Sequence, residues 1–267
     1  MSGDATVRHV RIELGYDGTD FYGSQRQASV RTVQQVVEDA LKRLTGSPVK
    51  IDLAGRTDRG VHAVGQVASA TIRWRRDEES LRYALDSLTP EDVSIRSVNE
   101  TAAGFHARFD ARSREYRFRV WNGATPLVLM RRYTWSVRQP LDVTRMNEAA
   151  AKLIGRQDFA SFAGAGLGVP GSPADCTREM ATAEWSVSSY GWERGSDDER
   201  LLEFRVQADR FLPHMIRNIV GNLVEVGRGA RSVEWFANVL ASRDRRAAPA
   251  GAPPQGLILW SVEYPTG

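Results

Sequence analysis

Residues 55–63 read GRTDRGVHA and place a single acid, Asp58, between Arg56 and Arg59. Flanking glycines let the backbone turn tightly and leave room for a ligand to approach. An aspartate with an ordinary pKa of about 3.9 is ionised at neutral pH; burial would favour its neutral form, and nearby arginine would keep it charged. On spacing alone two interpretations stay open: a carboxylate kept ionised for chemistry, or a surface aspartate in a hairpin turn.

A second candidate for chemistry is residues 108–120, RFDARSREYRFRV, in which arginines interleave with aromatic residues. The arginines are 108, 112, 114, 117 and 119, and the aromatic residues are Phe109, Tyr116 and Phe118. Arginine can hold phosphates, and an aromatic face can stack on a base, at about 1–3 kcal/mol per base. The same pattern fits an amphipathic edge strand with a solvated basic face, so both interpretations are kept.

Arg217 is the third candidate, because it borders the apolar stripe of a strong helical pattern. An arginine in that position needs an acid or a phosphate as partner, since burying its charge alone is costly. Alternatively, it extends its charged end to water from the edge of the core.

No metal site is predicted. The four histidines, His9, His62, His106 and His214, are dispersed, and no HExxH or DxD spacing occurs. One cysteine excludes both an internal disulfide and a Cys-rich zinc site. Signatures of a nucleophile elbow, a P-loop or a dinucleotide site are also absent. A metal-dependent phosphohydrolase using Asp52 and Asp58 is kept as an alternative.

The composition fits an ordinary globular protein of roughly two domains, with 267 residues, 42% of them hydrophobic and 26% charged. The formal net charge is +3, and its basic side is almost entirely arginine. The N-terminal residues contain no apolar run typical of a signal peptide, and no window approaches the ~20 apolar residues of a membrane span. These features predict a cytoplasmic protein that does not enter a membrane.

Strand and helix patterns interleave along the chain. Val10, Ile12, Leu14 and Tyr16 alternate with polar residues and predict a strand. Thr32 and Gln35 form a capping box, and Gly46 is expected to end that helix. Further helices are predicted at 80–88, at 141–155 with Asp142 as N-cap, at 210–229 with Asp209 as cap and Pro213 in its first turn, and at 232–244. Further strands are predicted within 49–74, and at 93–100, 110–122, 181–191, 201–209 and 257–264.

This order predicts an α+β fold of two similar halves, residues 1–105 and 106–267. Each half is expected to be an antiparallel sheet with helices on one face. The first half carries the Asp58 motif, and the second carries the Tyr116 strand and the Arg217 helix. Residues 163–177 are rich in glycine and proline and are predicted to form a mobile loop.

Five segments in this order resemble one family, the TruA-type tRNA pseudouridine synthases. They are YDGTDFYGSQRQ followed by TVQQVVEDAL, GRTDRGVHA, FHARFDARSREYRFRV, DRFLPHMIRNIVGNLVEVGRG and APPQGLILWSVEY. GRTDRGVHA, which is similar to the catalytic motif of the family, is the most specific of them. Ser24 departs from the pattern, because the family more often has tryptophan there.

The resemblance implies roles for four residues. Asp58 is the catalytic aspartate that attacks the target uridine, through C1′, through C6 or as a base. Arg56 helps to hold the flipped-out nucleotide, and Tyr116 stacks on the target base. Arg217 pairs with Asp58 and keeps it ionised. Further RNA contacts are predicted at Gln25, Arg26, Arg59, His62, His106 and Arg108.

The resemblance also implies the setting of this site. The two halves join their sheets around a central basic cleft, and the protein is a homodimer that uses neither a metal nor an organic cofactor. It isomerises uridines 38 to 40 in the anticodon arm of tRNA. The alternative from another class is a non-catalytic RNA-binding protein with a degenerate site.

Overall fold

The computed structural model describes residues 6–164, 167, 175–188, 199–249 and 251–265. The chain divides into two compact units. The first unit comprises the residues up to Arg114 together with those from Ile258 onward, and the second unit is Glu115–Leu257. The C-terminal residues thus return to the first unit after the whole second unit has been completed.

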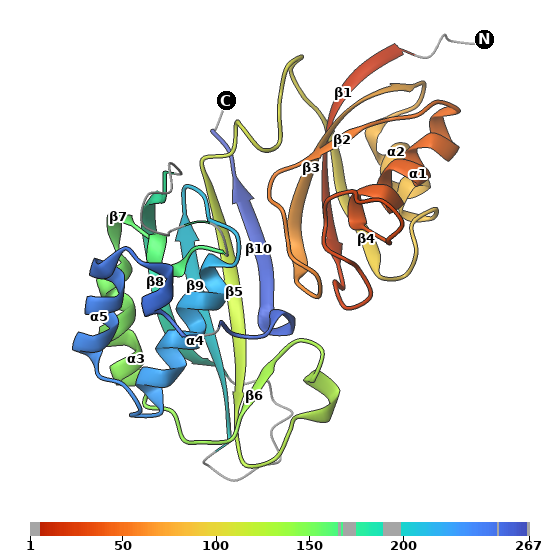
Figure 1. Cartoon of the computed structure of the whole chain (residues 1–267). Helices are drawn as coiled ribbons and strands as arrows, with labels where there is room; N and C mark the ends of the chain where they lie inside the picture. The colour runs from red at the N-terminus through yellow and green to blue at the C-terminus, as the bar shows by residue number, and fades with distance from the viewer. Residues whose placement is uncertain (1–5, 165–166, 168–174, 189–198, 250, 266–267) are drawn as a thin grey trace. The chain divides into compact units, whose positions relative to one another are not determined.

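The sheet of the first unit is built around β1 (Thr6–Tyr16), which pairs antiparallel with β3 (His62–Trp74) and β4 (Val93–Glu100). β2 (Ile51–Leu53) pairs antiparallel with β3. α1 (Val33–Thr45) and α2 (Glu78–Asp86) lie on one side of these strands (Figure 1). The alternating residues of β1 that predicted a strand are buried, so the polar–apolar alternation identified this strand and its core-facing side.

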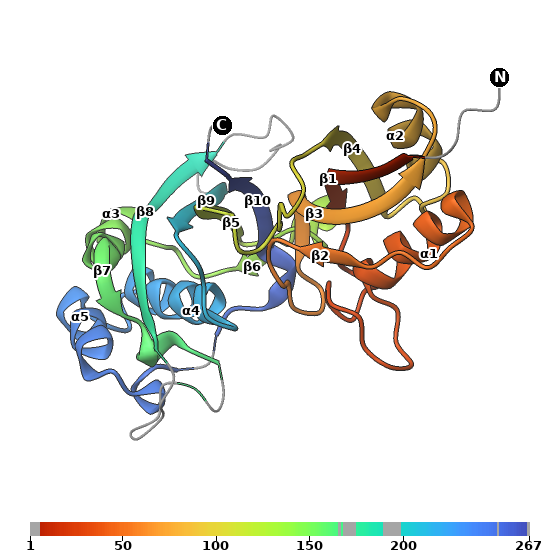
Figure 2. The same ribbon diagram turned by 90° about the horizontal axis from the view of Figure 1, so that it is seen from above.

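In the second unit the strand order is β5-β9-β8-β7, with β6 beside β5. The bounds are β5 (Ser113–Asn122), β6 (Trp135–Val137), β7 (Gly155–Asp158), β8 (Thr177–Ser188) and β9 (Arg200–Ala208). α3 (Val143–Ala150), α4 (Met215–Gly227) and α5 (Val233–Ser242) cluster beside these strands (Figures 1 and 2). Short 3₁₀ helices occupy Val128–Met130, Ala151–Leu153, Ala160–Phe162, Arg245–Ala247 and Pro254–Gly256.

The prediction of wholly antiparallel sheets is wrong at two strands. β10 (Leu257–Glu263) pairs parallel with β3, and β6 pairs parallel with β5. Parallel neighbours need a crossover connection of about a dozen residues or more. Residues 123–134 connect β5 to β6, and the second unit separates β3 from β10, so both connections are long enough.

Two predicted N-caps are confirmed and one is wrong. Thr32 accepts the N–H of Gln35 at 3.4 Å, and Asp142 accepts that of Arg145 at 3.1 Å. The cap predicted at Asp209 is not formed, because α4 begins only at Met215. Asp209 follows β9 and instead accepts the N–H of Glu179, at the start of the neighbouring strand, at 3.0 Å.

A smaller difference concerns α2, which spans 78–86 instead of the predicted 80–88. Asp77 caps it by accepting the N–H of Ser80 at 2.7 Å, so the helix starts earlier. The predicted loop at 163–177 lies largely outside the described residues. Among the residues that the structure does describe, no helix is long and apolar enough to cross a membrane.

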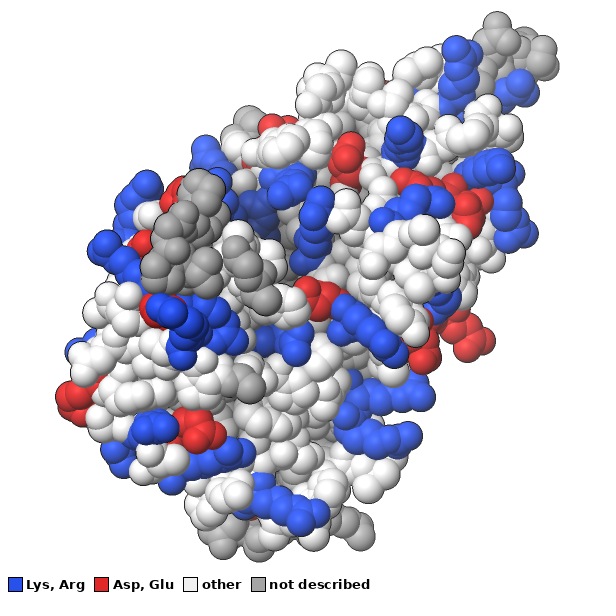
Figure 3. All heavy atoms as spheres, in the orientation of Figure 1, with Lys and Arg blue, Asp and Glu red and all other residues white. Residues whose placement is uncertain are grey.

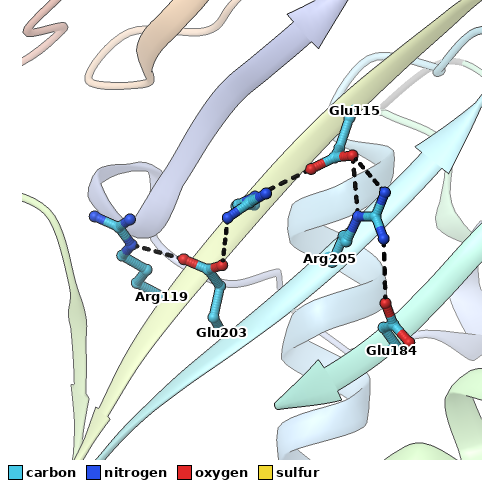
Figure 4. A network of polar contacts seen from close by, with 6 residues as sticks. Glu115, Arg119, Glu184, Glu203 and Arg205 are labelled. Atoms are coloured by element: carbon cyan, nitrogen blue, oxygen red, sulfur yellow. Dashed lines mark hydrogen bonds and ion pairs between the residues drawn. The ribbon is translucent and has the colours of Figure 1, made fainter. Parts of the chain in front are cut away.

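A ladder of opposite charges crosses β5, β9 and β8 of the second unit (Figure 4). Arg117 is 3.0 Å from both Glu115 and Glu203, and Arg119 is 3.0 Å from Glu203. Arg205 continues the ladder, at 3.0 Å from Glu115 and 3.5 Å from Glu184.

These pairs decide between the two interpretations of residues 108–120 for part of that segment. Arg117 and Arg119 are matched by carboxylates, and Phe118 is 0% exposed in the core. The interpretation that arginines here bind phosphate while aromatic residues stack on bases is therefore wrong for these three residues. The sequence did not reveal this because Glu203 is 86 residues away from Arg117.

We predict that Glu203→Ala lowers the free energy of unfolding by about 2–3 kcal/mol, because it leaves two poorly exposed arginines without their shared carboxylate. Glu184→Ala is the matched control, since Glu184 is 59% exposed and lies at the edge of the same ladder. The control should cost less than about 0.5 kcal/mol. Urea unfolding of both variants measures the difference, and equal losses would contradict the structural role of the ladder.

Candidate active site

Asp58 lies in the loop that connects β2 to β3 in the first unit. Its carbonyl accepts the N–H of Val61 at 3.1 Å, which closes a tight turn, and Gly60 in that turn has φ +77°. Glycine adopts this left-handed conformation without the steric cost of a side chain. Asp58 is half-buried, whereas Arg56 and Arg59 on either side are exposed. The loop therefore presents an acid flanked by two solvent-facing guanidinium groups.

The turn after β1 packs directly against the far end of this loop. A Cβ on Gly18 would collide with the carbonyl oxygen of Val61, so only glycine permits the approach. The N–H of Gly18 donates to Nδ1 of His62 at 3.0 Å, and Asp17 lies 3.1 Å from the same nitrogen. His62 is buried, so it is placed to hold the loop against this turn, and its predicted contact with RNA stays a prediction.

Two buried polar side chains, Tyr16 on β1 and Gln66 on β3, hold the loop by hydrogen bonds. The hydroxyl of Tyr16 is 2.8 Å from that of Thr57, the residue before Asp58. Gln66 donates to Tyr16 at 3.3 Å and to the carbonyl of Gly55 at 2.8 Å, and it accepts the N–H of Gly55 at 3.3 Å. Burial raises the pKa of Tyr16 to about 12. Tyr16 therefore stays a neutral hydroxyl near neutral pH and positions the loop without acting as a base.

The sequence did not reveal these supporting residues. The alternation along β1 placed Tyr16 in the core, but nothing in that pattern indicated a partner for its hydroxyl. Gln66 lies 50 residues beyond Tyr16 on another strand. No local signal in the sequence connects the two.

The predicted RNA contacts at Gln25, Arg26 and Arg59 lie on or near the loop that precedes α1. Gln25 is exposed, and Arg26 is anchored by Glu38 at 2.6 Å. The guanidinium of Arg59 lies over the ring of Tyr22, 4.2 Å from its centroid. An open pocket of about 640 Å³ is lined by residues 26–31, 35, 36 and 39 and does not include Asp58.

His106 and Arg108 belong to a small surface cluster around Phe109, which is 73% exposed. The His106 ring lies 4.3 Å from that of Phe109, and the Arg108 guanidinium lies 5.8 Å from it. Buried Arg114 holds this segment by donating to the carbonyls of Arg108 at 2.6 Å and Ala54 at 3.0 Å. The cluster is thus tied to the start of the loop that carries Asp58.

Tyr116 and Arg217 belong to the second unit. Tyr116 lies on β5 and meets the ring of Phe211 edge-on, with centroids 5.2 Å apart. Arg217 lies in the first turn of α4, where its Nε donates to the carbonyl of Ala252 at 2.8 Å and its Nη1 lies 3.2 Å from Nδ1 of His214. The structure places Arg56, Asp58 and Arg59 in one loop of the first unit and His62 at the start of β3, directly after that loop. The expected pairing of Asp58 with Arg217 stays a prediction.

Charge and metal-ligand distribution add two observations. Basic side chains are spread over both units, with acidic ones among them, on the face seen in Figure 3. Within the described part of the chain, no group of three or more His, Cys, Asp or Glu side chains could hold a metal ion. Asp52, the second acid of the phosphohydrolase alternative, lies 3.8 Å from His106.

The chain that contains this Asp58 loop matches a family model described as tRNA pseudouridine synthase. The match covers residues 14–110 and 149–265. The chain belongs to this family. A relative from Chloroflexus aurantiacus, called tRNA pseudouridine synthase A, is 43% identical over 98% of this chain and 90% of its own length. Relatives with the same name from Myxococcus xanthus and Moorella thermoacetica are 41% and 43% identical, over 97% and 96% of this chain and 92% and 99% of their own lengths.

We predict that the free energy of unfolding of Tyr16→Phe falls less than that of the wild type as the pH rises above about 10. A folded-state pKa of about 12 is above the usual 10.0 of tyrosine, so the unfolded chain releases this proton first as pH rises. The contribution of Tyr16 is complete below pH ~10 and is lost between ~10 and ~12, up to about 3 kcal/mol.

Urea unfolding of the wild type and Tyr16→Phe between pH 8 and 11 measures this change. The difference in unfolding free energy between them should shrink as pH rises. Tyr83→Phe is the control, because Tyr83 is 71% exposed, and it should follow the wild type at every pH. A wild type and Tyr16→Phe that stay equally far apart across the range would contradict the prediction.

Proposed function

We propose that the chain converts uridine to pseudouridine at positions 38 to 40 of the anticodon arm of tRNA, with Asp58 as the catalytic carboxylate. One observation carries this proposal. Asp58 stands in a tight turn between two exposed arginines, and its loop is anchored to β1 and β3. Membership of the tRNA pseudouridine synthase family supports the same reaction.

The reaction accounts for the residue types at the site. It breaks the N1–C1′ glycosidic bond, turns the base and joins C5 to C1′, so nothing is added or removed overall. No redox group is required by this balance. The carboxylate of Asp58 engages the sugar or the base, and the guanidinium of Arg56 holds the nucleotide that has been extruded from the stack. Extrusion costs a few kcal/mol, which contacts to the RNA backbone can offset.

Tyr116 and Arg217 complete the proposed site. The ring of Tyr116 stacks on the detached uracil, and the guanidinium of Arg217 keeps Asp58 ionised. The bond from Arg217 to the carbonyl of Ala252 supports this role, because it limits the directions in which the guanidinium can point. These two assignments rest on the family motifs.

RNA contacts are proposed at Gln25, Arg26, Arg59, His106 and Arg108. The exposed ring of Phe109 adds an aromatic face beside the last two. Contacts of arginine with phosphate make tRNA affinity fall as salt rises. The family resemblance supports two α+β halves around a basic cleft, a homodimer, and action in the cytoplasm.

The test is tritium release from tRNA transcripts labelled at C5 of uridine, with EDTA present. Forming the C5–C1′ bond expels this hydrogen, so the signal reports the chemistry. The wild type is expected to release tritium, and Asp58→Ala and Asp58→Asn are expected to bind tRNA and release none. Asp52→Ala is the matched control, because Asp52 precedes the same loop and is exposed.

Each other outcome identifies a different error. Release by both Asp58 variants would remove Asp58 from the mechanism. No release by a wild type that binds tRNA would favour the non-catalytic binder. A wild type that releases no tritium but hydrolyses a phosphate ester when a divalent metal ion replaces EDTA, and that loses this hydrolysis in Asp52→Ala, would favour the phosphohydrolase arrangement. Transcripts with cytidine at 38, 39 or 40 test the position, because replacing all three should abolish release.

A further inference from the structure

Thr57, which immediately precedes Asp58, has all three of its polar groups bound. Its N–H donates to Oγ of Ser24 at 2.9 Å, and its carbonyl accepts the N–H of Ser24 at 3.1 Å. Its hydroxyl is 2.8 Å from that of Tyr16. Thr57 is 7% exposed and Ser24 is 0% exposed, so water does not compete for these bonds. Ser24 and Thr57 form a closed two-bond clasp between segments 33 residues apart.

The clasp fixes the backbone of Asp58. The carbonyl of Thr57 and the N–H of Asp58 belong to one planar peptide group, so holding one orients the other. On the other side, the carbonyl of Asp58 accepts the N–H of Val61 at 3.1 Å. Both peptide groups that flank Asp58 are therefore held by hydrogen bonds.

Ser24 is itself anchored to α1. Its carbonyl accepts the N–H of Gln34 at 2.9 Å, in the first turn of that helix. The preceding residue, Gly23, has φ +90°, and a Cβ there would lie 2.8 Å from the carbonyl of Thr57. Glycine thus lets the segment approach closely enough for the clasp to form. Through Ser24, the loop of Asp58 is connected to the start of a helix.

Ser24 departs from the resemblance described above, in which tryptophan is more frequent at this position. Tryptophan, the residue expected there, offers a side-chain N–H donor and no acceptor. A tryptophan could keep the bond from its backbone N–H to Thr57 but could not accept the N–H of Thr57. The second bond of the clasp therefore depends on serine.

We propose that Ser24 is a positioning residue for Asp58, acting through Thr57 and touching neither RNA nor the reacting atoms. This role rests on the proposed function. It predicts that Ser24 affects the chemical step and not tRNA binding, since the exposed arginines that contact RNA do not depend on its hydroxyl. A residue that only stabilises the fold would not produce this separation.

The test compares Ser24→Ala with Ser161→Ala, using tritium release to obtain kcat and KM and thermal unfolding to obtain Tm. Ser161 is the matched control, since it is also 0% exposed and its Oγ accepts the N–H of Asp244 at 3.1 Å in the second unit. Ser24→Ala is expected to lower kcat about tenfold to a hundredfold, because small displacements of a reacting group have effects of that size. Its KM should stay within about twofold of the wild type. Ser161→Ala is expected to lower Tm at least as much and to leave kcat unchanged.

Two further variants make the result decisive. Ser24→Thr keeps the hydroxyl acceptor and should recover most of kcat. Tyr16→Phe removes the third bond to Thr57 and the hydrogen bond between the Tyr16 and Ser24 side chains, while it keeps the Ser24 hydroxyl in place. It should also lower kcat at constant KM. If Ser24→Ala does not fold, Tyr16→Phe decides, and an unchanged kcat in that variant overturns the proposal.

Several outcomes would overturn the role of Ser24. They are an unchanged kcat in Ser24→Ala, an equal loss of kcat in Ser161→Ala, or a change confined to KM. The proposed function fails in a different way, because the wild type itself would then release no tritium. An active wild type with an equally active Ser24→Ala would leave the function standing and remove only the positioning role.

Discussion

The loop that carries Asp58 depends on hydrogen bonds to its neighbours, because it contains no helix or strand of its own. Thr57 is bound by Ser24 and Tyr16, and Gly55 is bound by Gln66. Buried polar groups without partners would destabilise the fold. The same bonds therefore stabilise the first unit and fix the backbone of the acid, so fold stability and the placement of the carboxylate share their contacts.

The many arginines of this chain have different tasks. Arg117 and Arg119 are matched by Glu203, and Arg114 is buried against backbone carbonyls. Others, such as Arg56 beside Asp58, present their charge to solvent. The basic composition of the chain therefore overstates the charge available to a nucleic acid. RNA recognition has to come from exposed loops, where arginine and aromatic side chains such as Phe109 occur together.

The reaction of the family makes such a division understandable. Exchanging a C–N for a C–C glycosidic bond needs one carboxylate in a fixed place and groups that retain a detached base. Exposed loops supply adaptable contacts to a large substrate, whereas a buried network holds the acid. Ser24 belongs to the network and Gln25 to the exposed loop. Of two adjacent residues in one motif, one therefore helps to hold the acid and the other is exposed for contact with the substrate.

The sequence by itself determined the features that depend on neighbours a few residues away. The caps at Thr32 and Asp142 were predicted because the side chain and the N–H it accepts are three residues apart. The turn at Gly60 and the buried side of β1 followed from residue type and alternation. The Asp58 motif was identified from its similarity to a family.

Only the tertiary structure decided the features whose partners are far apart in the chain. It placed β10 parallel to β3, committed Asp209 to β8 instead of to a helix, and matched Arg117 with Glu203. It also closed the clasp between Ser24 and Thr57. A side-chain hydroxyl or carboxylate has several possible partners of equal chemistry. Which one it meets is decided by packing and strand order, which no local pattern records.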